Sequence, residues 1–411
     1  MEAEGNAIGF SYEEPRLLAM EDALHRRNTF WVVTLLCAAA LAMILAETGH
    51  RQVHPSRQSR ASATTKPAPT PTPFTAESKA NAKVDLASTP WPPIDVTKYM
   101  RIHNRDSAEE VRSNIVSFVW PSGRPLSDSL TKQPDTAFPS TELWTLTMKH
   151  GIVSRMYFVR AIKDSQCLFL YHAGHSVDPI LRPLVERFTS YGCDVVLISM
   201  PLYHINADAR FKSKSPHDEL RVFETPDFSP FAYFIEPVVR AIDEATKQRS
   251  YARIGMAGLS GGGWTTAFVG AIEPRIKYLY PVAGSMPFAL DVPPEQVGKR
   301  NVSSLRGDYE QSHSFYRTVT DYLDLYLLDV YGPGRRAIHF YIERDSCCFL
   351  GAASYAFSGQ ITQLAREITG NSLEFVVDTA AKRHEVSTTT LDAIFADFTG
   401  QQSVHRSDAG N

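Results

Sequence analysis

The sequence predicts an α/β fold in which a mostly parallel central sheet carries helices on both faces. Continuous apolar runs, such as residues 167–171 and 194–200, are typical of strands that are buried on both faces. Segments with helical spacing of apolar residues, such as 180–188, alternate with these runs. Because a helix that connects two parallel strands packs back onto the sheet, this alternation favours a parallel sheet covered on both sides.

Composition is consistent with a globular protein that has a sizeable core. The chain has 411 residues, of which 43% are hydrophobic and 21% are charged. Its formal net charge is −3 and no long basic run follows the first hundred residues, so we expect no nucleic-acid partner. The five cysteines show no zinc-ligand spacing, and neither a metal nor an organic cofactor is predicted.

The cysteines are expected to serve packing. Cys167 and Cys193 stand at the starts of two predicted strands, where buried free thiols are the favoured interpretation. Cys347 and Cys348 are adjacent in the chain, and packing is favoured over redox activity for them as well. The sequence therefore predicts no disulfide.

An apolar segment near the N-terminus predicts a membrane anchor. Residues 29–46 carry no charge and are long enough to cross the hydrocarbon core of a bilayer. A signal anchor is favoured over a cleaved signal peptide and over a buried helix, because the preceding segment is long and the cleavage motif is poor. The pair Arg26–Arg27 favours a cytoplasmic N-terminus, with the C-terminal domain on the periplasmic or extracellular side.

Differences in composition along the rest of the chain predict its division into tails, a linker and a folded domain. Residues 1–28 are expected to be a short tail, and 47–90 a linker rich in proline, threonine and alanine. The folded domain is expected to cover 91–400, followed by a flexible tail at 401–411. Within that domain, 203–225 and 288–319 are irregular and could form a small lid over a site.

The remaining elements follow from local patterns. Alternating apolar residues on either side of Lys149-His150-Gly151 predict an antiparallel hairpin. Ser229-Pro230 provides a cap and a proline at the first helical position, and therefore predicts the start of a helix that reaches residue 247. After residue 260, the expected strands are 276–282, 336–342 and 373–377, and the expected helices are 322–330, 355–368 and 391–398.

The segment Gly258-Leu259-Ser260-Gly261-Gly262 predicts a sharp strand–turn–helix corner. An apolar run enters it, and a segment of helical character leaves it at Trp264. A serine at such a corner is exposed for nucleophilic attack, and its flanking glycines let other backbone pass closely. The helix N-terminus would offer N–H groups to a developing oxyanion. The alternative is a glycine-rich turn in which Ser260 only caps the helix.

Acyl transfer requires an activated serine, an imidazole that carries the proton and a carboxylate that holds the imidazole. Asp345 follows the predicted strand that ends at residue 342, and His384 follows the last predicted strand. Such groups belong at the carboxyl ends of the strands in a parallel sheet. Glu343 is the alternative to Asp345, whereas Asp378 is expected to be a strand-end or turn residue.

From about residue 142 to residue 398, the chain resembles the α/β-hydrolase superfamily of serine esterases and lipases. The resemblance rests on the corner at Ser260, on the order Ser, Asp, His and on their placement at strand ends. It implies an α/β-hydrolase fold in which Ser260 is the nucleophile, His384 the general base and Asp345 the orienting carboxylate.

The resemblance also implies an oxyanion hole. The Gly261 amide would be one donor, and Ala173 or Gly174, in the loop after the strand ending at Tyr171, would be the second. This loop departs from the glycine-rich form of many lipases. The neighbouring His172 and His175 are expected to contact substrate.

These predictions combine into a membrane-anchored serine hydrolase that cleaves an ester or related acyl bond of a small-molecule or lipid-like substrate. A peptidase or an acyltransferase would use the same three residues. A catalytically inactive domain with this fold, used for binding at the cell surface, is the alternative from another functional class.

Overall fold

The computed structural model describes residues 91–124, 130–135, 140–163, 166–176, 178–290, 308–345 and 347–401. The predicted tail, membrane anchor and linker at 1–90 lie outside these residues, as does most of the tail at 401–411. Within the described part of the chain, no helix is long and apolar enough to span a membrane.

A mixed sheet forms the centre of the described domain. Its strands are β1 (Leu130–Pro134), β2 (Thr141–Thr147), β3 (Val153–Val159), β4 (Cys167–Ala173), β5 (Cys193–Ser199), β6 (Arg253–Leu259), β7 (Tyr278–Val282), β8 (Arg336–Ile342) and β9 (Ser372–Asp378). Their order is β1-β2-β3-β5-β4-β6-β7-β8-β9. Pairing is antiparallel from β1 to β5 and parallel from β5 to β9. The predicted hairpin and mostly parallel sheet are confirmed.

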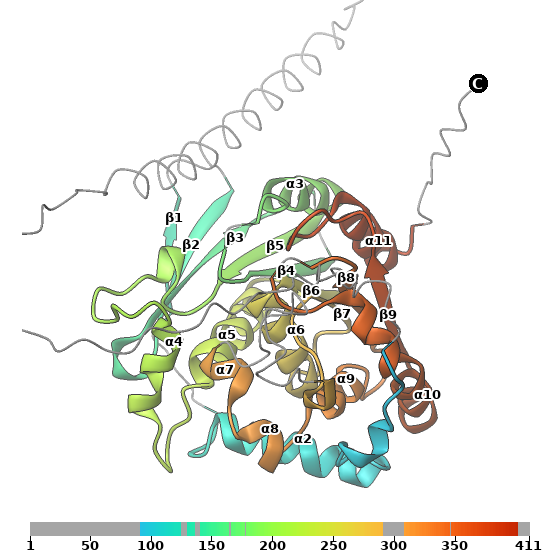
Figure 1. Cartoon of the computed structure of the whole chain (residues 1–411). Helices are drawn as coiled ribbons and strands as arrows, with labels where there is room; N and C mark the ends of the chain where they lie inside the picture. The colour runs from blue at the N-terminus through green and yellow to red at the C-terminus, as the bar shows by residue number, and fades with distance from the viewer. Residues whose placement is uncertain are drawn as a thin grey trace, which may run out of the picture. The chain divides into compact units, whose positions relative to one another are not determined.

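Helices cover both faces of the sheet, as predicted. They are α2 (Arg105–Val119), α3 (Leu181–Tyr191), α4 (Pro216–Glu219), α5 (Ala232–Gln248), α6 (Gly261–Ile272), α7 (Tyr309–Ser312), α8 (Phe315–Thr318), α9 (Tyr322–Asp329), α10 (Ser358–Thr369) and α11 (Thr388–Thr399). Figure 1 shows α3 and α11 on one side of the sheet, and α5, α6 and α9 on the other.

Aromatic side chains join α3 and α11 to the sheet. The Phe169 ring on β4 stacks on Phe188 of α3, with ring centroids 3.8 Å apart, and meets Phe398 of α11 edge to face at 5.2 Å. Gly255 on β6 leaves room for this packing, because a Cβ atom there would lie 2.5 Å from the Phe398 ring. Burial of each such phenylalanine contributes about 1.5–3 kcal/mol to the stability of the fold.

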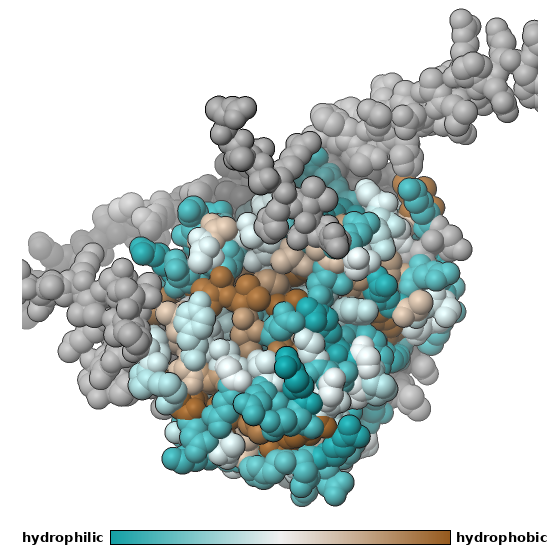
Figure 2. Space-filling model, turned by 90° about the vertical axis from the view of Figure 1, so that its right-hand side faces the viewer, coloured by the Kyte–Doolittle hydropathy of each residue, from teal (hydrophilic) through white to brown (hydrophobic). Residues whose placement is uncertain are grey.

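The surface in Figure 2 is mainly hydrophilic, with hydrophobic residues in several patches.

Helix α5 begins later than the sequence predicts. Ser229 does not cap the first helical turn, because its Oγ accepts a hydrogen bond from the Phe231 amide and closes a turn before the helix. The helix begins at Ala232 and continues through Pro237 to Gln248.

The prediction of free cysteines is wrong. Cys167 and Cys193 are paired residues at the starts of the parallel neighbours β4 and β5, and they form a disulfide with a Cα–Cα distance of 4.7 Å. Cys347 and Cys348 are also joined by a disulfide. The two bonds differ in position, since the first ties strand starts whereas the second follows the carboxyl end of β8.

Candidate active site

Ser260 stands at the corner between β6 and α6. Its backbone angles are φ 59° and ψ −124°, in a region that non-glycine residues rarely adopt, so the corner is strained. The Val282 carbonyl of β7 accepts a hydrogen bond from the Ser260 amide at 3.0 Å. Within the described residues, the Ser260 side chain makes no capping bond to α6, so the structure does not support the alternative of a mere cap.

Close backbone contacts explain the glycines around this corner. A Cβ atom at Gly262 would lie 1.9 Å from the His172 carbonyl oxygen on β4. A Cβ atom at Gly258 would lie 2.4 Å from the Gly262 carbonyl oxygen. Any larger residue would therefore push α6 away from β4 and move Ser260 off the strand end.

The structure brings Asp345 and His384 into direct contact. His384 Nδ1 lies 2.8 Å and 3.0 Å from the two carboxylate oxygens of Asp345. The carboxylate is buried, and its Oδ1 also accepts hydrogen bonds from the amides of Cys347 and Cys348 at 2.7 Å and 3.1 Å. Neutral His384 that donates from Nδ1 carries a lone pair on Nε2. Within the described part of the chain, Nε2 has no hydrogen-bond partner.

The two other carboxylates considered from the sequence make contacts with residues other than His384. Asp378 accepts hydrogen bonds from the amides of Ala380 and Ala381 and from the hydroxyl groups of Ser387 and Thr390. It therefore holds the turn between β9 and α11, as expected. Glu343 is partly exposed, with its carboxylate 3.8 Å from the Arg344 guanidinium.

The loop after β4 lies against the serine corner. A Cβ atom at Gly174 would be 2.9 Å from the Ser260 Cβ and 3.2 Å from the Gly261 amide nitrogen. Backbone of this loop is thus beside the N-terminus of α6, where the expected oxyanion donors would be. The Ala173 carbonyl oxygen lies 2.8 Å from His172 Nδ1. Burial lowers the pKa of His172 to about 4, and its side chain is only 1% exposed, which favours a structural role over substrate contact.

His175 connects the serine corner to a second polar cluster. A Cβ atom at Gly261 would lie 2.8 Å from His175 Cε1, so the His175 ring covers the start of α6. His175 Nε2 lies 3.4 Å from His217 Nδ1, 3.4 Å from Asp308 Oδ2 and 3.6 Å from Glu310 Oε1. The sequence did not identify His217, Asp308 or Glu310, since they belong to two irregular segments that carry no motif.

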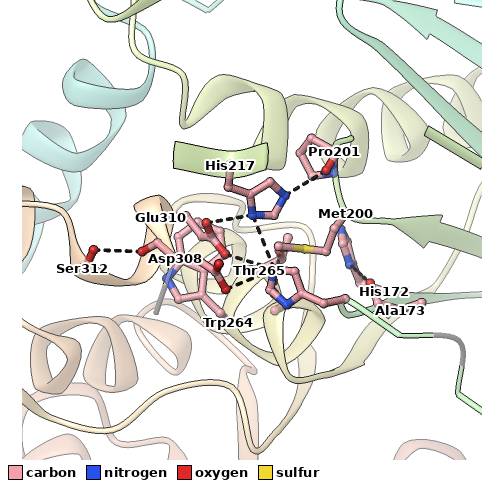
Figure 3. A network of polar contacts seen from close by, with 12 residues as sticks. His172, Ala173, Met200, Pro201, His217, Trp264, Thr265, Asp308, Glu310 and Ser312 are labelled. Carbon is pink, nitrogen blue, oxygen red and sulfur yellow. Dashed lines mark hydrogen bonds and ion pairs between the residues drawn. The ribbon is translucent and has the colours of Figure 1, made fainter. Parts of the chain in front are cut away.

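His217 and Glu310 form the buried centre of this cluster, and both side chains have 0% exposure. His217 Nε2 lies 2.8 Å from the Pro201 carbonyl oxygen, and Nδ1 lies 3.0 Å from Glu310 Oε2 (Figure 3). Burial opposes the charged imidazolium, but the charge and hydrogen bond of Glu310 raise the pKa of His217 overall. In turn, although burial opposes it, the nearby histidines lower the pKa of Glu310. Burial and the Glu310 charge raise the pKa of Asp308.

The chain is similar to known proteins only at the level of solved structures: no protein-family model and no curated protein matches it. Among solved structures it is similar to acetyl xylan esterase 1 from a Thermoanaerobacterium species, with 13% identity and a TM-score of 0.50 over 76% of this chain and 100% of that chain. It is also similar to a glucuronoyl esterase from Solibacter usitatus, with 11% identity and a TM-score of 0.50 over 73% and 94% of the two chains. These similarities show that the chain has the α/β-hydrolase fold.

Proposed function

We propose that this protein is a serine hydrolase that cleaves a carboxylic ester through an acyl-enzyme intermediate. His384 Nε2 accepts the proton of the Ser260 hydroxyl as Ser260 Oγ attacks the carbonyl carbon. The same proton passes to the leaving alcohol, after which water attacks the acyl-enzyme with His384 again as base. Asp345 holds the imidazole in the tautomer that this step requires.

The contact between His384 and Asp345 carries the proposal. A carboxylate on Nδ1, together with an Nε2 that has no hydrogen-bond partner in the described residues, is the arrangement of a general base. The strained corner supports Ser260 as nucleophile, because its hydroxyl group is not used to cap α6.

Backbone amides would stabilise the oxyanion. The Gly261 amide stands at the N-terminus of α6, where the helix dipole favours negative charge. The second donor in the proposal is an amide of the loop at Ala173 and Gly174, which lies against Gly261. His175, whose ring covers Gly261, is in a position to contact the substrate.

The substrate class is supported by the two similar structures, which are named as an acetyl xylan esterase and a glucuronoyl esterase. An ester of a small acyl group or of a sugar acid is therefore favoured over an amide. A lipid-like acyl group stays compatible with the proposed chemistry.

The proposal includes a membrane anchor at residues 29–46 and an exported hydrolase domain. The disulfide between Cys167 and Cys193 supports export, because such bonds persist in oxidising compartments. Full-length protein in a membrane fraction is expected to resist alkaline carbonate washing and to dissolve in detergent. Release by carbonate alone would contradict the anchor.

A fluorophosphonate probe tests the catalytic part. Full-length protein is expected to label at Ser260, and labelling is expected to disappear in Ser260→Ala and His384→Ala variants. Ser250→Ala, at an exposed serine, is the matched control and is expected to label normally. A folded wild-type protein that does not label would contradict the proposal and favour an inactive binding domain.

A further inference from the structure

Four side chains from three segments of the chain converge beside the serine corner. They are His175 from the loop after β4, His217 from α4, and Asp308 and Glu310 at the start of α7. One ring nitrogen each of His175 and His217 and one carboxylate oxygen of Asp308 lie within 4.8 Å of one another. The Glu310 carboxylate contacts both histidines, at 3.0 Å from His217 Nδ1 and 3.6 Å from His175 Nε2.

The spacing around His175 Nε2 fits a tetrahedral metal ion. Zinc binds histidine nitrogen and carboxylate oxygen at about 2.0–2.2 Å, so neighbouring ligand atoms in a tetrahedron are about 3.3 Å apart. The contacts between His175 Nε2 and its three neighbours measure 3.4, 3.4 and 3.6 Å. The spacing around His175 Nε2 is therefore close to that of a tetrahedral site.

The hydrogen bond at the other ring nitrogen of His217 resembles that of a metal-bound histidine. A metal-bound histidine usually donates its other ring N–H to a carbonyl or carboxylate, which fixes the tautomer. The Pro201 carbonyl oxygen, 2.8 Å from His217 Nε2, is such an acceptor. When a cation displaces the Nδ1 proton, the lone pair of Nδ1 faces the Glu310 carboxylate, 3.0 Å away (Figure 3), and His175 Nε2, 3.4 Å away.

Glu310 is an independent indication of a ligand. Its side chain is fully buried, and its Oε1 has no hydrogen-bond partner among the described residues. A buried carboxylate oxygen that accepts no hydrogen bond is costly, and a bound cation removes that cost. Two carboxylates, two neutral imidazoles and one divalent ion also give a cluster of zero net charge.

We propose that His175, His217, Asp308 and Glu310 bind one divalent transition-metal ion of the zinc class. Imidazole nitrogen together with carboxylate oxygen suits such an ion. The ion joins α4 and α7 to the loop after β4, and it holds the His175 ring over Gly261. The ion thereby fixes the position of the loop beside the serine corner.

Zinc binding to the metal-free full-length protein tests this site directly. Calorimetric titration with Zn²⁺ is expected to show one site per chain, and Co²⁺ is expected to give the visible absorption of a tetrahedral ion. Absence of both signals in the folded wild-type protein would overturn the proposal.

Variants locate the ion. His217→Ala and Glu310→Gln are each expected to weaken zinc binding by more than roughly 100-fold, the upper range for loss of a group outside the coordination sphere. His103→Ala, at an exposed histidine, is the matched control. Unchanged zinc affinity in both cluster variants would overturn the proposal, and the isosteric Glu310→Gln keeps the test valid if His217→Ala does not fold.

A second set of possible metal ligands has to be distinguished from the proposed site by experiment. Cys347, Cys348 and His384 also bring ligand atoms within 4.8 Å of one another, although the two cysteines are joined in a disulfide. A Cys347→Ser/Cys348→Ser variant is expected to bind zinc with wild-type affinity, and loss of binding in it would overturn the assignment. Ser260→Ala is expected to retain zinc binding, so the metal site and the proposed hydrolase activity can fail separately.

Discussion

Two histidine–carboxylate pairs near the carboxyl ends of the strands differ in how they use the second ring nitrogen. In the pair His384–Asp345, the carboxylate holds Nδ1, and Nε2 has no hydrogen-bond partner within the described residues. In the pair His217–Glu310, the carboxylate also faces Nδ1, but Nε2 donates to the Pro201 carbonyl. The first imidazole can accept a proton, whereas the second is fixed on both sides.

The two histidines also differ in how deeply their side chains are buried. The His384 side chain is 12% exposed, and the His217 side chain is 0% exposed. A general base must reach the nucleophile, whereas a fully buried pair is costly to break because one charge is left without its partner. The same two residue types are therefore assigned to proton transfer in the proposed mechanism and to cohesion in the cluster.

The largest expected effect is the loss of activity when the first pair or its serine is removed. Ser260→Ala and His384→Ala are each expected to lower kcat by about 10⁶-fold for an activated ester, because the three groups act as a unit. Hydrolysis of p-nitrophenyl acetate is the measurement, with circular dichroism to show that the variants are folded. A variant that retains a tenth of wild-type kcat would remove its residue from the proposed mechanism.

Asp345→Asn is expected to lower kcat by about 10⁴-fold. The introduced amide would donate to His384 Nδ1, so the proton would move to Nε2 and the base would be lost. Glu343→Gln, two residues earlier in the chain, is the matched control and is expected to change kcat less than twofold. A larger loss in the control than in Asp345→Asn would assign the orienting carboxylate to Glu343.

Glu310→Gln is expected to act first on stability. Loss of one partner from a buried ion pair costs about 3–5 kcal/mol, because the other charge is left in a low-dielectric environment. Urea denaturation at pH 7 without metal measures the free energy of unfolding. Glu367→Gln, at an exposed carboxylate, is the control. Equal stability of the two variants would show that His217 and Glu310 do not form an ion pair in solution.

The contrast between these pairs also explains which part of the site the sequence could predict. Ser260, Asp345 and His384 each follow a recognisable strand, so strand-end placement was enough to select them. His217 and Glu310 are 93 residues apart in irregular segments, and only the folded structure brings them together. The disulfide of Cys167 with Cys193 similarly depends on the register of β4 and β5, which no local pattern specifies.

The elements of the fold could be predicted where the burial of a strand or helix leaves a pattern of apolar residues in the sequence. Strand β8 has the predicted bounds, because its apolar run is buried on both faces. Strand β1 was not predicted, since it is a polar edge strand of which no residue is fully buried. Helix α2 was also not predicted, although its buried residues recur at helical spacing. Its capping box uses Asn104 and Ser107, where a glutamate or glutamine is usual at the second position.

A third histidine, His172, extends the comparison to the pH dependence of stability. Burial lowers the pKa of His172 from 6.5 to about 4, so the folded state keeps this imidazole neutral at neutral pH, whereas the pKa of His217 is shifted upward. Above pH 6.5, the folded and unfolded states both hold it neutral and its contribution to stability is fully present. Between pH 6.5 and 4 only the unfolded state binds the proton, and therefore stability falls as the pH falls.

The expected size follows from the difference of 2.5 pKa units between 6.5 and 4, which corresponds to about 3 kcal/mol. Urea denaturation of the wild type and of His172→Gln at pH 7 and pH 4.5 measures it, with exposed His103→Gln as control. The wild type and the control are expected to lose most of this energy between the two pH values, and His172→Gln is expected to lose correspondingly less. Equal losses in all three proteins would mean that the pKa of His172 is the same in the folded and unfolded states, so that burial does not keep this imidazole neutral.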